Sequence, residues 1–207
     1  LTHIRHSEKV FIMKRLLLVL ILMFGFQSLS TADDINDFEI AGLSIGVSAL
    51  DFLTKSKIES TKDNDPQNGY LYKVKDFYAL TFYDIKGLDN YDSIQIHFKN
   101  KDKKYLIYGF AGLKEFQNNI QECPKLMKKI ALTLDEVLSS ADKEIYERYE
   151  HSSKQGFLET YWYSYNNNAN IVLSCEDWNK ETNIVDMLAL SVNSSELQKF
   201  FNAKAYK

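Results

Sequence analysis

The stretch Ser93–Ala111, SIQIHFKNKDKKYLIYGFA, decides the fold class. Its first part, Ser93–Lys99, alternates strictly between apolar and polar side chains. Alternation with a period of two is typical of a strand that buries one face. The polar run Asn100–Lys103 then predicts a turn, and Tyr105–Ala111 predicts the returning strand. A hairpin of this kind favours an antiparallel sheet with one face exposed to water.

Working outward from this hairpin, further runs rich in β-branched and aromatic residues predict more strands. They are Phe38–Ala41, Tyr70–Lys75, Phe77–Tyr83, Ile145–Glu150, Phe157–Tyr165, Ile171–Asp177 and Val185–Val192. Polar turns separate the later ones, at Ser152–Gly156 and Asn166–Asn170. The runs are short and follow each other closely, which argues against a parallel sheet with crossover helices.

Three helices are predicted between and after the strands. The longest is Pro124–Ala141, where apolar residues recur at three- and four-residue spacing and Pro124 suits the first turn. Ser48 suits the N-cap of a helix over Ala49–Ile58, and Ser195 with Gln198 forms a capping box for a terminal helix. The expected fold is therefore α+β, with one or more antiparallel sheets, a long central helix, and short N- and C-terminal helices packed on one side.

The first 32 residues have the pattern of an export signal. Lys14 and Arg15 precede an apolar run, Leu16–Phe26, and small and polar residues follow up to Ala32. We expect residues 1–12 to be an upstream leader that is not translated, residues 13–32 a signal peptide, and residues 33–207 a single α+β domain. The alternative is that the apolar run stays as an N-terminal anchor, although it is shorter than a membrane-spanning helix requires.

Removal of the signal leaves an acidic chain. Residues 33–207 keep 21 basic and 27 acidic residues, a net charge of −6. Because such a charge repels phosphate backbones and anionic lipids, nucleic acid is not an expected partner. Only Arg148 remains of the arginines, which excludes an arginine clamp. We expect no cofactor, and after signal cleavage no integral membrane segment.

Cys123 and Cys175 are the two cysteines of the chain. An exported protein reaches an oxidising compartment, where a pair of cysteines is usually bonded. The sequence therefore predicts a disulfide that ties the start of the Pro124–Ala141 helix to the strand that contains Cys175. Two buried free thiols are the alternative.

Two motifs resemble known sites without their context. Gly42–Gly46 (GLSIG) matches the G-x-S-x-G pattern of hydrolases, but it lies near the mature N-terminus before any sheet is built. Asp63–Gly69 resembles a calcium loop, but the twelfth position counted from Asp63 is Val74 instead of glutamate. We interpret the first as a glycine-permitted turn into a capped helix and the second as a solvated loop.

The remaining titratable residues form no recognisable catalytic spacing. His97 lies on the polar face of a predicted strand, and His151 lies beside a turn. Glu159 and the pair Glu176-Asp177 supply carboxylates on neighbouring predicted strands. Paired carboxylates carry out glycosidic chemistry only at a suitable separation, which the sequence does not give. Neither histidine has a cysteine or a carboxylate pair at a fixed spacing. We therefore predict no catalytic residue and no metal site.

Aromatic residues give the best indication of a function. Tyr161, Tyr163 and Tyr165 share one face of a predicted strand, and Trp162 lies on the other face. Aromatic rings on a sheet stack on sugars or anchor a protein partner, and they also pack well inside a core. We take these four residues as the candidate binding residues.

Four segments resemble a known group of proteins. They are FEIAGLSIGVSALDFL (38–53), YDSIQIHFKNKDKKYLIYGFAG (91–112), NNIQECPKL (118–126) and IVLSCEDW (171–178). Together they resemble small exported proteins of unknown function from low-GC marine alphaproteobacteria. This resemblance implies a periplasmic location and the cysteine pair, and it implies no activity. The turn at Ile40–Ser44 is more distantly similar to the start of BamE-like and β-lactamase-inhibitor-like domains, although the chain has no lipid-attachment cysteine.

The sequence thus favours an exported periplasmic binding or interaction module without catalytic activity. Its expected partner is another envelope protein, a small solute or a glycan. The alternatives are an accessory or scaffold protein of envelope assembly and, less favoured, a periplasmic hydrolase of unrecognised type.

Overall fold

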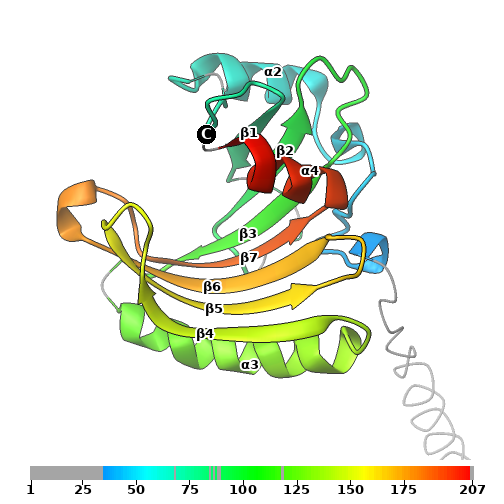
Figure 1. Ribbon diagram of the computed structural model, residues 1–207. Helices are drawn as coiled ribbons and strands as arrows, with labels where there is room; N and C mark the ends of the chain where they lie inside the picture. Colours follow the sequence, from blue (N-terminus) through cyan, green and yellow to red (C-terminus); the bar gives the residue numbers. More distant parts are fainter. Residues whose placement is uncertain are drawn as a thin grey trace, which may run out of the picture. The chain divides into compact units, whose positions relative to one another are not determined.

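One antiparallel sheet organises the part of the chain that the structure describes (Figure 1). The computed structural model describes residues 35–205, except residues 68, 84, 86, 88, 89 and 118. In their order across the sheet, the seven strands are β1 (Phe77–Phe82), β2 (Ser93–Lys99), β3 (Gly109–Glu115), β7 (Met187–Asn193), β6 (Asn170–Trp178), β5 (Gly156–Ser164) and β4 (Asp142–Glu150). The expected leader and signal peptide lie outside the described residues.

Three α-helices are described, with short 3-10 turns between the elements. The helices are α2 (Lys55–Asn64), α3 (Cys123–Val137) and α4 (Ser195–Phe200), and α4 continues into a π-helical turn, η5 (Phe201–Ala205). The 3-10 turns are η1 (Ile35–Asp37), η2 (Ala49–Asp51), η3 (Ile120–Glu122) and η4 (Lys180–Thr182). None of the helices in these described segments is long and apolar enough to cross a membrane.

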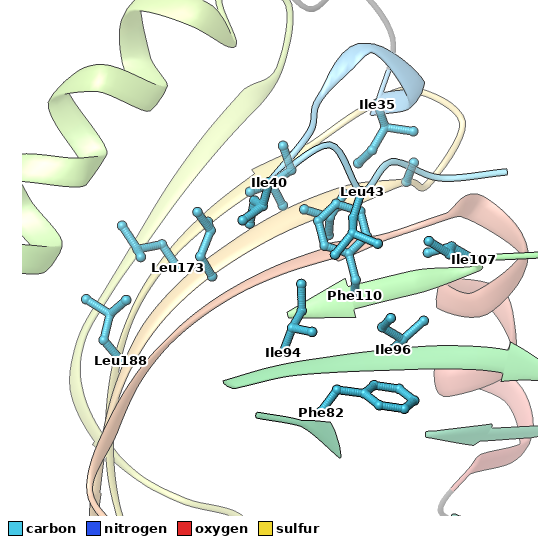
Figure 2. Packing of buried hydrophobic residues seen from close by; sticks show 14 of the residues in the cluster. Ile35, Ile40, Leu43, Phe82, Ile94, Ile96, Ile107, Phe110, Leu173 and Leu188 are labelled. Atoms are coloured by element: carbon cyan, nitrogen blue, oxygen red, sulfur yellow. The ribbon is translucent and has the colours of Figure 1, made fainter. Parts of the chain in front are cut away.

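The two faces of the sheet differ in what covers them. One face, called the core face here, carries alternate apolar side chains such as Ile94, Phe110 and Leu173, which form the main hydrophobic core. Figure 2 shows this packing, to which Leu43 of the N-terminal segment also belongs. Helix α3 covers the core face at β6 and β7, and α2 adds Ile58 to the same core.

Within the described residues, helices cover the opposite face, called the open face here, at one end of the sheet. Helix α4 and η5 pack there against Phe77 of β1 and His97 of β2. The contact is close, since a Cβ atom added at Gly109 of β3 would lie 2.4 Å from Leu197 Cδ2. Glycine at this position therefore lets α4 approach the sheet. Figure 1 shows β4, β5 and β6 as long curved strands at the other end of the sheet.

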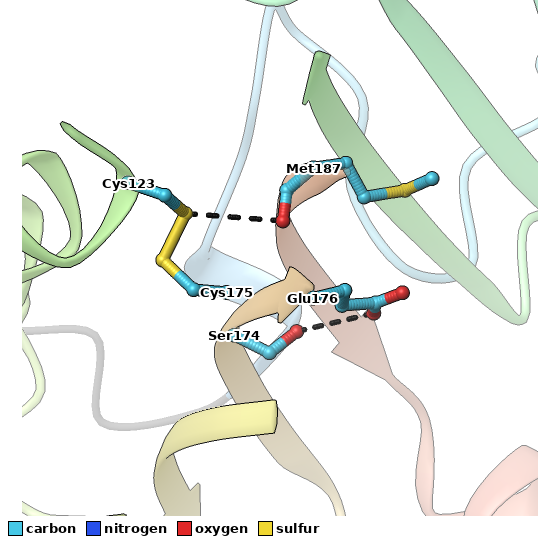
Figure 3. Close-up of a disulfide and its surroundings, with 5 residues drawn as sticks. All are labelled: Cys123, Ser174, Cys175, Glu176 and Met187. Atoms are coloured by element: carbon cyan, nitrogen blue, oxygen red, sulfur yellow. Dashed lines mark hydrogen bonds between the residues drawn. A yellow bond between two sulfur atoms is a disulfide. The ribbon is translucent and has the colours of Figure 1, made fainter. Parts of the chain in front are cut away.

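The disulfide between Cys123 and Cys175 is present, as the sequence predicts (Figure 3). Cys123 is the first residue of α3 and Cys175 lies in β6 on the core face. Both residues are buried, and Cys123 Sγ lies 3.8 Å from the carbonyl oxygen of Met187 in the neighbouring strand β7. The bond therefore fixes the start of α3 against the middle of the sheet.

The α+β class is confirmed, but two details of the expected helices are wrong. Helix α3 has only 15 residues, so the long helix that we expected is not present. The helices also do not share one side, because α4 packs on the open face and α3 on the core face. The physical reason is that alternation places the apolar Phe77 on the outer face beside His97, and the rings of Phe200 and Phe201 pack against these two side chains there.

Several predicted element bounds also shift. Ser48 caps only the short turn η2, and the chain starts α2 afresh at the second cap, Thr54. The segments Phe38–Ala41 and Tyr70–Lys75 are not strands; the first makes a single bridge, between Ile40 and Leu43.

Candidate functional site

The four predicted binding residues lie on both faces of β5. Tyr161 and Tyr163 face the core, since they are opposite Leu173 and Ile171 of β6. Tyr163 is only 1% exposed, and its hydroxyl donates to Asp135 Oδ1 at 2.9 Å. Burial, with that carboxylate, raises the pKa of Tyr163. Tyr161 and Tyr165 also pack against the core. Tyr163 therefore offers no exposed ring, because α3 covers it, whereas Tyr161 and Tyr165 remain half-buried.

Trp162 is the predicted residue that stands on the open face. Its cross-strand neighbours are Glu144 of β4 and Val172 of β6. Trp178, the only other tryptophan of the chain, has the same parity in β6 and is opposite Gly156 of β5. Both indoles therefore belong to the open face.

A bulge in β4 adds two tyrosines to this face. Tyr146 is opposite Thr160, but the register then shifts so that Tyr149 is opposite Leu158. Without the extra residue, Tyr149 would alternate onto the core side; bulges often re-aim side chains in this way. The rings of Tyr146 and Tyr149 meet edge to face at 6.2 Å. The Tyr149 hydroxyl lies 3.3 Å from Thr160 Oγ1, and the Tyr146 hydroxyl donates to Glu144.

Small polar and apolar residues form the floor between these larger rings. Thr160, Ser174 and Ala189 lie opposite one another across β5, β6 and β7. They are only 4–5% exposed although no helix covers them, because larger neighbours stand beside them. Hydroxyl groups thus lie at the base of a surface that is edged by aromatic rings.

The carboxyl group of Glu176 belongs to this surface and has a raised pKa. Glu176 lies between Leu158 of β5 and Met187 of β7. Burial raises the pKa of Glu176, and the hydroxyl of Ser174, which donates to Oε1 at 3.3 Å, offsets only part of this effect. The indole Nε1 of Trp178 is buried and has no hydrogen bond of good geometry among the described groups, but it lies near enough to lower the pKa of Glu176 slightly. The indole N–H of Trp178, beside Glu176, is therefore a donor that a ligand on the open face could use.

Replacing Glu176 with glutamine tests the state of this carboxyl. A raised folded pKa means that the folded protein favours the protonated form, so ionisation above that pKa destabilises it. We expect Glu176→Gln to melt at a higher temperature than the wild type at pH 8. The difference in melting temperature between the two proteins should shrink as pH falls and Glu176 becomes neutral. A glutamine variant that is less stable at pH 8 than the wild type would contradict this interpretation.

The remaining sequence candidates do not come together in one site. His97 is buried under η5, and its Nδ1 lies 3.2 Å from the Tyr72 hydroxyl. His151 Nδ1 lies 2.7 Å from Ser153 Oγ, and its ring contacts Trp178 at the edge of the open face. Glu159 and Glu176 point to opposite faces of the sheet and do not form a carboxylate pair.

The two loop motifs agree only in part with what we expected, because GLSIG leads into the 3-10 turn η2 instead of a helix, and Asp63 and Asn64 form the end of α2. Gly42 and Gly46 of the GLSIG motif both have φ of +81°, as a glycine-dependent turn requires. In the calcium-like loop, Asp65 Oδ1 accepts from the backbone nitrogens of Gln67 and Gly69, so it caps its own turn. Within the described residues, no three or more His, Cys, Asp or Glu side chains gather as metal ligands would.

Sequence reasoning missed Tyr146, Tyr149, Thr160 and Glu176 as members of one surface. The aromatic pair at three-residue spacing in a strand was the available signal, because regular alternation cannot place both rings on one face. Comparison of the chain with protein-family models, with curated proteins and with solved structures finds no match.

Proposed function

We propose that this protein is a non-catalytic binding module of the periplasm, and that it binds a glycan on the open face of β4–β6. The observation that supports this most directly is the β4 bulge, which brings Tyr146 and Tyr149 onto the same face as Trp162. The Cys123–Cys175 bond is compatible with an exported protein, because such bonds persist in oxidising compartments.

The chemistry of the surface suits a sugar. Sugar rings offer apolar C–H faces, which stack on aromatic rings, and hydroxyls, which exchange hydrogen bonds with small polar groups. Here the rings of Trp162 and Tyr146 stand diagonally across two strands, and Thr160 and Ser174 supply hydroxyls beside them. Ligand sites typically combine aromatic walls with a few placed polar groups in this way.

Two glutamates of the open face stand far apart in the sheet. Glu144 and Glu176 are separated by two strands and four residues in register. Ideal strand spacing and rise place their backbones about 17 Å apart. They can therefore contact a long ligand at two separate points.

Truncation of Trp162 tests the proposal. Both tryptophans lie on the open face, so intrinsic fluorescence reports ligand binding there. We expect soluble peptidoglycan fragments or other oligosaccharides to change the emission of the wild type. Because a central aromatic contact is often worth about 2 kcal/mol or more, Trp162→Ala should weaken binding at least tenfold, with the remaining signal coming from Trp178.

The matched control is Tyr83→Ala, which removes a ring that is 64% exposed at the end of β1, away from the open-face aromatics. This variant should bind as the wild type does. Equal weakening in both variants, or a full oligosaccharide panel without any response, would refute the glycan proposal.

A further inference from the structure

A separate cavity lies where β1, β2, α4 and η5 meet. Its volume is about 560 Å³, and it lies beside the strand ends Phe77 and Lys99 and the turn that begins at Asn100. Helix α4 contributes Lys199 and η5 contributes Lys204. No residue of the open-face aromatic surface lines it. Cavities of this size hold small organic ligands.

The cavity is basic although the chain is acidic. Five lysines and two acidic residues line it, a net charge of +3, whereas the whole chain carries −3. The lysines come from three places in the sequence: before β1, around the β2–β3 turn, and in the C-terminal helical segment. Folding brings these like charges together against their mutual repulsion.

The two acidic residues compensate only part of this charge. Lys99 pairs with Glu196 at 2.5 Å, and Lys204 pairs with Asp76 at 3.2 Å. Each pair joins the C-terminal segment to the sheet side of the cavity. Lys75, Lys101 and Lys199 have no ion pair within the described part of the chain. Among the described residues, Lys101 and Lys199 therefore offer their charges to a ligand, whereas Lys75 Nζ also lies 4.9 Å from the centroid of the Tyr70 ring.

The walls between the lysines are aromatic. Phe77 and Phe200 are 3% and 5% exposed, and their ring centroids are 5.0 Å apart. Ala203 and Lys204 come from the π-helical turn η5, a conformation that is rare and often occurs at functional sites. A ligand with a compact negative group and a small apolar or ring-shaped body would match both the charge and the walls.

We propose that this cavity binds a phosphate group with more than one negative charge, carried either by a soluble phosphorylated molecule or by a lipid headgroup. Lysine ammonium groups bind phosphate as point charges and need no planar fork, so the scarcity of arginine does not oppose this assignment. An anion also relieves the repulsion among the lysines and therefore stabilises the fold. The site is independent of the proposed glycan surface.

The test uses inorganic pyrophosphate as a soluble probe, followed by calorimetric titration at low salt. We expect binding to the wild type, a rise of several degrees in Tm at saturation, and a Kd that increases with ionic strength. The double variant Lys101→Gln/Lys199→Gln should bind at least about tenfold more weakly. Without ligand it should melt no lower than the wild type, because it loses like-charge repulsion instead of a structural contact.

The control carries the same change in net charge at another place. Lys154→Gln/Lys180→Gln removes two exposed lysines at the β4–β5 turn and η4, and it should keep wild-type affinity. Equal weakening in both double variants, or no binding of pyrophosphate by the wild type at millimolar concentration, would overturn the assignment.

Vesicles separate the two sources of phosphate. Flotation with phosphatidylcholine vesicles that contain one part in five of phosphatidic acid, competed by pyrophosphate, would identify a lipid headgroup. Pyrophosphate binding without vesicle binding would identify a soluble phosphorylated ligand. Both results support a phosphate site, and only the variants decide whether it is this cavity.

Discussion

Replacing Cys123 and Cys175 together with serine should lower the free energy of unfolding by about 4 kcal/mol. The two cysteines are 52 residues apart, and a cross-link over a loop of that length restricts the unfolded chain by about this amount in the chain-entropy model. For a chain of this size the loss corresponds to a drop of about 8–16 °C in Tm. Melting curves of both proteins under oxidising conditions measure it.

The control is the same comparison in reductant, after both proteins have been unfolded and refolded. Neither then contains the bond, so their Tm values should converge. Cys175→Ser alone should leave Cys123 as a thiol that reacts with a thiol reagent only in denaturant, since Cys123 is fully buried. Equal Tm values without reductant would contradict a stabilising role for the disulfide.

The loop closed by the disulfide contains most of the proposed glycan surface. Between Cys123 and Cys175 the chain forms α3, β4 and β5, including Tyr146, Tyr149 and Trp162. Strand β4 is an edge strand, and all nine of its residues are exposed. Because an edge strand has one neighbour only, the anchoring of this loop should also protect the geometry of the surface.

The alternation of apolar and polar residues is enough to predict the bounds of a strand that has one apolar and one polar face. Strand β2 has the bounds that its alternation predicts, Ser93–Lys99. The returning strand begins later than expected, at Gly109, because the Asp102 carboxylate accepts from the backbone nitrogens of Lys104 and Leu106 and holds a longer turn. Tyr105, in that turn, adopts a φ of +52° that no sequence pattern indicates.

Alternation also cannot decide which face of an aromatic strand is buried. In β5 it places Tyr161 and Tyr163 on one side and Trp162 on the other, but both sides are aromatic. The decision comes from α3, whose buried residues Met127, Ala131 and Leu134 lie over the tyrosine side. The β4 bulge depends in the same way on pairing between distant segments.

Net charge does not describe how charges are distributed over the fold, for a related reason. The mature chain is acidic, and an acidic chain as a whole repels phosphate. The structure, however, gathers Lys75, Lys101 and Lys199 from distant positions around one cavity. A sum over the sequence contains no information about such a local excess.

Acidification from pH 7 to pH 4 should remove about 3 kcal/mol of stability through His97 alone. This residue alternates onto the outer face of β2, where Tyr72, α4 and η5 bury it. The Tyr72 ring stacks beside it at 6.3 Å, and Phe201 meets it edge to face at 5.8 Å. Burial lowers the pKa of His97 from 6.5 to about 4.

The direction follows from the two protonation states. In the folded protein His97 is neutral above pH 4, whereas in the unfolded chain it binds a proton below about pH 6.5. The unfolded state thus takes up one more proton between these values, and stability present above pH 6.5 is lost as pH falls. The difference between a pKa of 6.5 in the unfolded chain and about 4 in the fold corresponds to about 3 kcal/mol. Glu176 acts in the opposite direction, because its pKa is raised in the fold.

Comparison with His97→Gln isolates the effect, since Glu176 and all other groups are shared. Glutamine keeps a hydrogen-bonding side chain beside the Tyr72 hydroxyl but does not titrate. Denaturant unfolding at several values between pH 4 and pH 7.5 should show a smaller acid loss in this variant, by about one proton over the range. The control His151→Gln retains His97 and should still lose stability on acidification. Parallel pH profiles for the wild type and His97→Gln would show that His97 does not stay neutral, and hence that α4 and η5 do not seal it from water.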